Sequence, residues 1–147
     1  MKNIKIQFTY MIALLAILLS TQSVAAQEEA HFFEVTTWKL QIPEDGSRAE
    51  LNTVLKEWHQ KVVLKNPKVL STKVLVHISG ADMRDWVIIT EYANWNDINE
   101  AGNLNGKLVA EGWPDEAKRK QFFDTFNKYA ITHSDEILQE VPELTKN

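Results

Sequence analysis

The stretch Asp85–Trp95, with the sequence DWVIITEYANW, limits the possible folds more than any other part of the chain. Side chains of a strand alternate between the two faces of its sheet. One face of this stretch therefore carries Trp86 and Ile88, and the other carries Val87 and Ile89. Since both faces are apolar, the stretch predicts a central strand that is covered on both sides.

The first 26 residues have the pattern of a secretory signal peptide. Lys2 and Lys5 precede the apolar segment Tyr10–Leu19, and the small residues Val24, Ala25 and Ala26 match a cleavage site. The apolar segment is shorter than the about 20 residues that a membrane-spanning helix needs. We expect cleavage after Ala26, or alternatively after Ala25. This leaves one domain, residues 27–147, that is secreted or periplasmic and has no further membrane contact.

Charge and cysteine content exclude several classes of function. The chain has 147 residues, with 16 Lys and Arg and 20 Asp and Glu. The predicted cleavage removes two lysines and no acid, so 14 basic residues remain against 20 acidic ones and the net charge becomes −6. No basic cluster remains, which argues against a nucleic-acid partner. The absence of cysteine excludes disulfides and thiol catalysis.

Apolar periodicity and turn residues predict four strands. β-branched and aromatic residues alternate with polar ones or form short unbroken runs, bounded by Gly, Pro, Asn and Asp. The predicted strands are His31–Ile42, Val69–Ser79, Asp85–Trp95 and Glu136–Leu144.

Three helices are predicted between these strands. Ser47 and Glu50 form an expected capping box, in which each side chain satisfies a free backbone N–H of the other, and the helix that follows ends at Asn66-Pro67. Gly102, Gly106 and Gly112 weaken helix formation after the third strand. We therefore expect a short helix at Asn94–Leu104, a partly ordered loop at Asn103–Trp113 and a helix at Pro114–Ile131.

The order β-α-β-β-α-β, with a small helix inserted after the third strand, predicts a ferredoxin-like α+β fold. Its two main helices cover one face of a four-stranded antiparallel sheet, and the chain offers no third long helix for the other face. An exposed apolar face of this size is typical of an interface. We therefore expect a two-fold homodimer that closes the two sheets into a dimeric α/β barrel.

Three segments resemble the dimeric α/β-barrel superfamily, which includes the antibiotic-biosynthesis-type monooxygenases. These segments are FFEVTTWKLQ, the capped helix after Ser47, and VIITEYANWNDINEA, and the resemblance covers most of Phe32–Leu144. The chain departs from many members in the longer segment Asn103–Trp113 and in His133–Ile137. Activities in the superfamily range from cofactor-free oxygenation and haem breakdown to no known reaction. The resemblance therefore implies a fold more than a function.

The candidate catalytic and ligand-binding residues are polar side chains on the face of the strands that carries Val87 and Ile89. Glu91 shares a face with Val87 and Ile89, where burial would raise its pKa and suit it to act as a general base. Alternatively, Glu91 pairs with Lys73 or caps a helix. Lys73 and His77 would line the same pocket, with His77 as a second catalytic candidate, or would lie at a solvated edge.

Aromatic residues supply the apolar part of the predicted pocket. Trp38 and Trp86 would stack on a planar ligand or belong to the core or an interface. Trp95 and Trp113 would form a lid or anchor the intervening segment. His133 lies beside acidic residues but lacks a second histidine at ligand spacing, so we expect a helix-end histidine, no metal site and no cofactor.

Three hypotheses about function follow. In the first, the protein is an exported homodimer that binds a small apolar or aromatic molecule through five residues: Trp38, Lys73, His77, Trp86 and Glu91. In the second, the same scaffold is a cofactor-independent or haem-degrading monooxygenase, in which Glu91 or His77 assists proton removal. In the third, the protein is a structural or interaction dimer whose pocket is filled by its own side chains.

Overall fold

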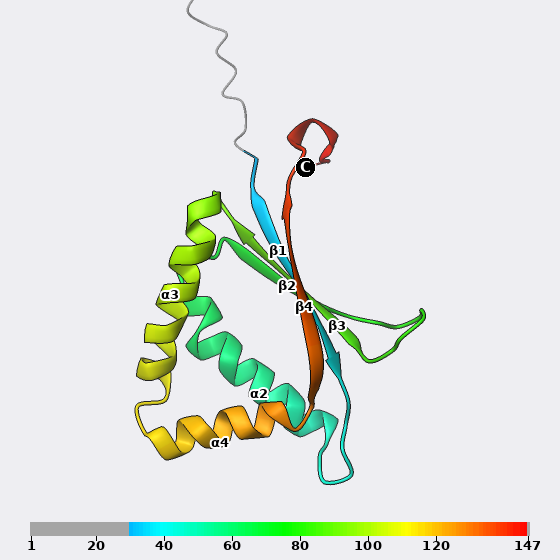
Figure 1. Ribbon diagram of the computed structural model, residues 1–147, viewed down its shortest axis with the longest axis vertical. Coiled ribbons are helices and arrows are strands. Elements are labelled where there is room, and N and C mark those ends of the chain that lie inside the picture. Colours follow the sequence, from blue (N-terminus) through cyan, green and yellow to red (C-terminus); the bar gives the residue numbers. More distant parts are fainter. Residues whose placement is uncertain (1–29, 147) are drawn as a thin grey trace, which may run out of the picture.

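The computed structural model describes residues 30–146, arranged as a sheet with helices on one side (Figure 1). The predicted signal peptide, residues 1–26, lies outside the described residues. Within residues 30–146, no helix is long and apolar enough to cross a membrane. This arrangement confirms the α+β, ferredoxin-like fold with a four-stranded antiparallel sheet.

The sheet has the strand order β2-β3-β1-β4, with every neighbouring pair antiparallel. The first three predicted strands are present in shortened form, whereas the fourth overlaps the observed strand only at residues 136–139. The observed bounds are β1 Phe32–Leu40, β2 Ser71–Val76, β3 Asp85–Tyr92 and β4 Ala130–Gln139. The predicted central strand is confirmed, because β3 lies between β2 and β1.

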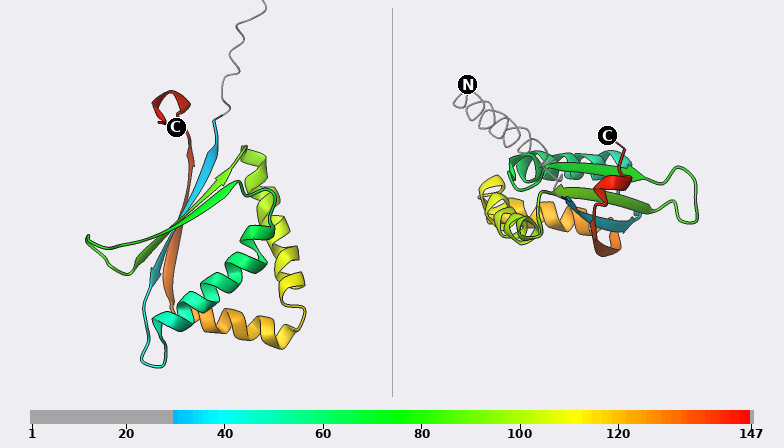
Figure 2. Two further views of the ribbon diagram at one scale, coloured as in Figure 1. Left: turned by 180° about the vertical axis from the view of Figure 1, so that it is seen from behind. Right: turned by 90° about the horizontal axis from the view of Figure 1, so that it is seen from above.

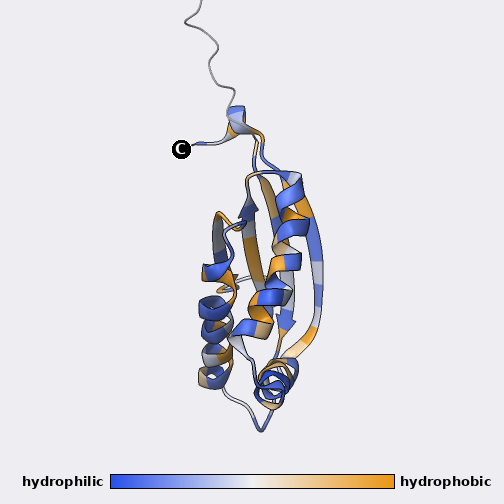
Figure 3. Cartoon of the chain, turned by 90° about the vertical axis from the view of Figure 1, so that its left-hand side faces the viewer, coloured by the Kyte–Doolittle hydropathy of each residue, from blue (hydrophilic) through white to orange (hydrophobic). Residues whose placement is uncertain are grey.

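The three long helices are α2 Arg48–Lys61, α3 Trp95–Gly112 and α4 Glu116–Asn127. Short 3-10 helices follow at Val63–Lys65 and Pro142–Leu144. Views from behind and from above show all three long helices on the same side of the sheet (Figure 2). The outer turns of these helices are largely hydrophilic, whereas hydrophobic residues are frequent in the strands behind them (Figure 3).

Strand register assigns each side chain to a sheet face. Trp38 of β1 pairs with Trp86 of β3, and the Trp38 ring packs edge-on against Phe126 of α4 at 5.0 Å between ring centroids. Even-numbered residues of β1 and β3 therefore face the helices. Odd-numbered residues, among them Val87 and Ile89, face the other way. We call that second side of the sheet the open face.

Two buried clusters form the core. One joins the helices through Val54, Val62, Leu108, Trp113 and Phe122. The other joins the start of α2 to the end of β1 through Leu40, Leu51 and Tyr129, with Trp38 and Trp86 packed against them. Both clusters lie on the helix side of the sheet, so the core leaves the open face without helical cover.

The prediction for Asn103–Trp113 was wrong: the segment is not a loop, because α3 continues as a helix to Gly112. A Cβ added to Gly102 or Gly106 would have no atom within 4 Å, so both glycines lie on the outer surface of the helix. Each lowers the stability of the helix by about 1 kcal/mol relative to alanine. Packing of the inward residues offsets that cost. The chain thus has a third long helix, contrary to expectation, but this helix shares the side already covered by α2 and α4.

The predictions around β4 also need correction. Helix α4 ends at Asn127 rather than Ile131, and β4 begins at Ala130 rather than Glu136. His133 was expected at a helix end, but it lies within this strand, at register with Trp38. The polar residues that suggested a break are tolerated because β4 is an edge strand and is exposed along most of its length.

Only half of the predicted capping box is formed. The Ser47 side chain accepts a hydrogen bond from the Glu50 N–H at 3.1 Å, as expected. The Glu50 carboxylate instead accepts from the Tyr129 hydroxyl and pairs with Lys128. The Ser47 N–H donates to the Tyr129 oxygen at 2.9 Å. Tyr129 therefore ties the start of α2 to the start of β4.

Asn66, which follows the 3-10 helix Val63–Lys65, forms hydrogen bonds with residues in the middle of α3. Its substitution tests whether these contacts stabilise that helix. Its side-chain amide is buried and donates to the Ala101 carbonyl at 3.1 Å and to Asn105 Oδ1 at 2.8 Å. We expect Asn66→Ala to lower the free energy of unfolding by about 1–3 kcal/mol, since it leaves buried polar groups without partners. Urea titration would measure this difference.

Asn103→Ala is the matched control, because Asn103 is exposed on the same helix. This control variant should change stability by less than about 0.5 kcal/mol. Equal effects of the two substitutions would contradict the role assigned to Asn66.

Candidate functional site

The five residues predicted to line one pocket lie on different parts of the sheet. Trp38 and Trp86 face the helices and are register partners on β1 and β3. Lys73 and Glu91 are on the open face, on β2 and β3. His77 follows β2 at the start of the turn toward β3. Within the chain the structure therefore brings the two tryptophans together but does not unite all five residues.

Glu91 is held by hydrogen bonds rather than left unpaired in an apolar setting. Its carboxylate accepts from the Ser71 hydroxyl at 2.5 Å and lies 2.6 Å from His31 Nδ1. The hydrogen bond from Ser71 is the largest cause that lowers the pKa of Glu91. Burial raises this pKa, whereas His31 and the charge of Lys73 lower it further. The expected raised pKa is thus wrong. The carboxylate is a weaker base than a free glutamate. Its hydrogen-bond partners are Ser71 and His31, whereas the predicted partner was Lys73.

His77 lies where the chain leaves β2. Its backbone N–H donates to the Asp85 carbonyl at 3.4 Å, and its Nδ1 is buried with no hydrogen-bond partner among residues 30–146. A Cβ added to Gly80, whose φ is 151°, would lie 3.4 Å from that nitrogen. The imidazole therefore packs against the hairpin turn, away from the Glu91 cluster at the other end of the β2–β3 ladder.

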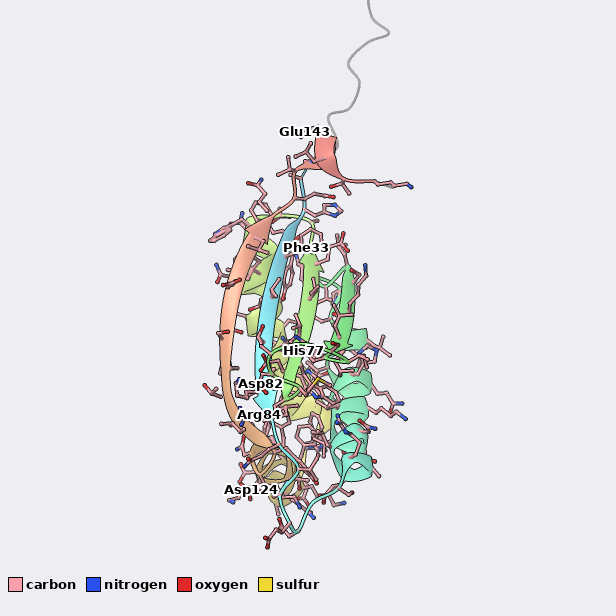
Figure 4. The ribbon with its side chains drawn as sticks, turned by 90° about the vertical axis from the view of Figure 1, so that its right-hand side faces the viewer. Phe33, His77, Asp82, Arg84, Asp124 and Glu143 are labelled. Atoms are coloured by element: carbon pink, nitrogen blue, oxygen red, sulfur yellow. The ribbon has the colours of Figure 1, made fainter. Side chains whose placement is uncertain are left out.

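The open face combines apolar side chains with this one hydrogen-bonded cluster. Figure 4 looks onto the sheet from this side, with Phe33 toward one end of the sheet and Arg84 toward the other. Leu75 on β2 is 49% exposed and Leu138 on β4 is 51% exposed, so large apolar side chains face solvent on both edge strands. The apolar residues of this face are Phe33, Val35, Leu75, Val87, Ile89 and Leu138.

A row of polar residues on the helix side was missed by the sequence analysis. The Tyr92 hydroxyl donates to Glu34 at 2.9 Å, and burial together with the Glu34 carboxylate raises the pKa of Tyr92. Thr72 Oγ1 is buried with no hydrogen-bond partner among the described residues. A usable signal was present: Glu34 and Thr36 lie between Phe32 and Trp38 on one face of the strand, so polar residues occupy positions that should face a core.

His133 extends this polar row toward Trp38. Its ring stacks on the Trp38 indole at 4.3 Å, and its Nε2 lies 3.3 Å from Asp135. Asp135 in turn accepts from the Thr36 hydroxyl at 2.8 Å. Both His133 and Asp135 are exposed at the sheet edge. Among residues 30–146, no group of three or more His, Asp or Glu side chains converges as metal ligands.

A cleft of about 220 Å³ opens beside Trp86, between the end of β1, the start of α2 and the base of the β2–β3 hairpin. The Arg48 guanidinium lies over the Trp86 ring, 5.1 Å from its centroid. Arg84 is fixed by two hydrogen bonds to Asp82, of 2.9 and 2.8 Å. We call this the Trp86 cleft; it is lined by Leu40, Gln41, Ile42, Arg48, Leu51, Met83, Arg84 and Trp86.

Trp113 supports a second cleft of about 320 Å³ between α2 and α4. Its indole is 4% exposed, and its Nε1 donates to Glu57 at 2.9 Å. Lys61 lies 4.3 Å from the Trp113 ring centroid and pairs with Glu57 at 2.6 Å. Trp113 is therefore an anchor for the end of α3 rather than a lid. Trp95 is 53% exposed at the other end of that helix.

The lowered pKa of Glu91 predicts a particular pH dependence. Because the carboxylate titrates at a lower pH in the folded than in the unfolded protein, its stabilisation is present above the unfolded pKa of about 4.3. It is lost as pH falls through the folded value. Glu91→Gln should therefore destabilise the protein at about pH 7 and have progressively less effect below about pH 4.

Urea unfolding at fixed protein concentration and several pH values would measure this trend. Glu44→Gln, at an exposed position on the loop before α2, is the control. A destabilisation by Glu91→Gln that is the same at every pH would contradict the assigned charge interaction.

The chain resembles known proteins in its structure. No family model matches the chain, and no curated protein matches it. Solved structures do. A dimeric ferredoxin-like protein from an uncultured marine organism has 10% identity and a TM-score of 0.54, with 82% of this chain and 96% of that chain covered.

Two further structures agree with that result. A variant of SnoaB, a cofactor-independent oxygenase from Streptomyces nogalater, has 11% identity and a TM-score of 0.52, covering 79% of this chain and 98% of that one. A Dabb family protein with a ferredoxin-like fold from Mesorhizobium loti has 10% identity and a TM-score of 0.51, covering 74% and 95%. The chain thus shares the ferredoxin-like fold of these proteins, and the resemblance expected from the sequence is confirmed at the level of the fold.

Proposed function

We propose that this protein is an exported homodimer that binds a small aromatic or apolar molecule in the Trp86 cleft. The observation that carries the proposal is the cleft itself, where an indole and aliphatic side chains meet at a solvent-accessible opening. Ligand sites are typically concave and mainly apolar, with few polar groups that fix orientation. Trp86, one of the five residues expected to bind a ligand, lies in this cleft, and Trp38 packs in the same cluster.

The open face supports the dimer. The three helices leave it uncovered, although β3 places Val87 and Ile89 there. Exposed apolar patches of this kind are typical of interfaces. The similar structure from the marine organism is described as dimeric. A second copy would meet this face with the same apolar side chains, as a two-fold interface requires.

Export rests on the sequence alone. The charged start, short apolar segment and small-residue cleavage site within residues 1–26 support a secretory signal. A protein without cysteine needs no oxidative folding in the periplasm or outside the cell, so its composition is compatible with either destination.

A cofactor-independent oxygenase is the second candidate. One similar structure is an oxygenase of this kind, and Glu34 and Tyr92 supply a carboxylate and a phenol on the helix side of the sheet. Glu91, whose pKa is lowered, is a weaker candidate for the base than the sequence suggested. The arrangement of these side chains does not favour the haem-degrading alternative over the cofactor-independent one.

Adjacent residues on β2 provide a matched test of the dimer. Leu75 is on the open face and 49% exposed, whereas its neighbour Val74 is on the opposite face and 50% exposed. We expect Leu75→Asp to raise the dimer dissociation constant by at least about tenfold, because an unpaired carboxylate would be buried in the interface. Val74→Asp should leave the dissociation constant unchanged.

Sedimentation equilibrium measures both constants, and circular dichroism verifies that each variant is folded. A wild-type protein that stays monomeric at high concentration, or a dimer equally weakened by the two substitutions, would overturn the proposed interface.

Binding of 2-naphthol, an uncharged planar probe, tests the ligand site. We expect saturable binding by isothermal titration calorimetry and at least about tenfold weaker binding by Trp86→Ala, since the indole supplies the stacking surface. Trp95→Ala is the control, because Trp95 packs on Phe32, about 20 Å from Trp38 along β1 at ~3.3 Å per residue. Equal affinities in all three proteins would place the probe elsewhere.

Oxygen uptake in the same preparations, with a hydroquinone added, separates the two candidate functions. Turnover that Glu34→Gln abolishes would favour the oxygenase. No turnover, together with binding that depends on Trp86, would favour a binding protein.

A further inference from the structure

Both charged side chains that line the Trp86 cleft are cationic, although the chain as a whole is acidic. Its charged lining residues are Arg48 and Arg84, with no carboxylate among the lining side chains. The complete chain carries a formal net charge of −4. An acidic protein generally repels small anions, so a cleft lined by two guanidinium groups is a local exception. Clefts lined by one sign of charge concentrate ligands of the opposite sign.

The two arginines differ in how far their donors are already used. Arg84 donates from Nε and one terminal nitrogen to Asp82, and Lys39 also lies 2.5 Å from that carboxylate. This network holds the pKa of Asp82 far below its usual range. Arg84 is therefore largely neutralised by its neighbour and serves to fix the cleft wall.

Arg48 has no such partner. No carboxylate of residues 30–146 lies within ion-pairing distance of its guanidinium, and the side chain makes no hydrogen bond within that part of the chain. Its contact is with the face of the Trp86 ring. The guanidinium carries five N–H donors in one plane, and none of them has a hydrogen-bond acceptor among residues 30–146. A cation with free donors thus lies beside an aromatic ring.

In the second cleft, a cation beside a tryptophan is paired with a carboxylate of the protein. There Lys61 lies over Trp113 but also pairs with Glu57, which accepts the indole N–H as well. The cation and the aromatic ring share an internal carboxylate. At Arg48 and Trp86 the corresponding carboxylate is missing from the described residues, so the same arrangement lacks its third member.

We propose that the missing carboxylate is supplied by the ligand, and that the Trp86 cleft binds a small planar aromatic carboxylate. The ring of the ligand lies against Trp86 and the aliphatic lining, and its carboxylate accepts two hydrogen bonds from Arg48. Arg–carboxylate pairs favour this bidentate geometry. The inference rests on the proposed function and adds the charge of the ligand and the residue that recognises it.

A pair of probes with the same ring system tests the charge separately from the site. 2-Naphthoate carries a carboxylate, and 2-naphthol is uncharged at neutral pH. We expect wild-type protein to bind 2-naphthoate at least about tenfold more tightly than 2-naphthol, with a difference that shrinks as salt is added. Isothermal titration calorimetry measures both dissociation constants.

Substitutions identify the residue responsible. Arg48→Gln should remove the preference for 2-naphthoate while 2-naphthol binding changes little, and Arg48→Lys should keep part of the preference because the charge remains. Lys56→Gln is the matched control, since it removes one positive charge from an exposed position on the same helix. This control variant should bind both probes like the wild type.

The possible results separate the two levels of the proposal. Equal binding of the two probes, or an unchanged preference in Arg48→Gln, would overturn the anionic ligand while the aromatic site stands. Failure of wild-type protein to bind either probe would overturn the Trp86 cleft as a site and the proposed function with it. A preference lost equally in Lys56→Gln would indicate a general charge effect and reject the role of Arg48.

Discussion

Alternation of side chains along β3 is the constraint on which the rest of the structure depends. The strand lies between β2 and β1, so each residue must point either toward the helices or toward the open face. Apolar residues occur on both sides, as Trp86 and Ile88 show on one and Val87 and Ile89 on the other. Since all the long helices lie on one side, the fold has one face with cover and one without. The proposed dimer uses the uncovered face, and the Trp86 cleft and the polar row lie on the covered one.

The sequence predicted the sheet better than the connections between strands. Alternation and turn residues located the first three strands, because strand patterns depend on neighbours one and two positions away. The fourth was predicted too late in the chain and overlaps β4 only at residues 136–139. Three glycines made α3 look like a short helix and a loop. What stabilises it instead is packing of Ala101 and Leu108 and the contact from Asn66, which is distant in sequence. Likewise, the polar run at His133 fits a strand only because that strand lies at the edge of the sheet.

The candidate site was predicted in part, for a related reason. Trp38 and Trp86 were both expected to line the pocket, and the register of β1 with β3 brings them together on the helix side of the sheet. Glu91 drew attention because an acid lay among apolar residues, but Ser71 and His31, which reverse the expected pKa shift, are on other strands or before β1. Arg48 carried no sequence signal at all. An arginine on the first turn of a helix is ordinary, and only the fold places it over Trp86.

The hairpin between β2 and β3 projects beyond the sheet on the side away from the helices (Figure 1), while residues at its base, Met83 and Arg84, form part of the cleft wall. One segment therefore belongs both to the region that a second protomer would approach and to the region that a ligand would occupy. If dimer formation alters the hairpin, it alters the affinity of the cleft by some factor. Thermodynamic linkage then requires the ligand to alter the affinity between protomers by that same factor.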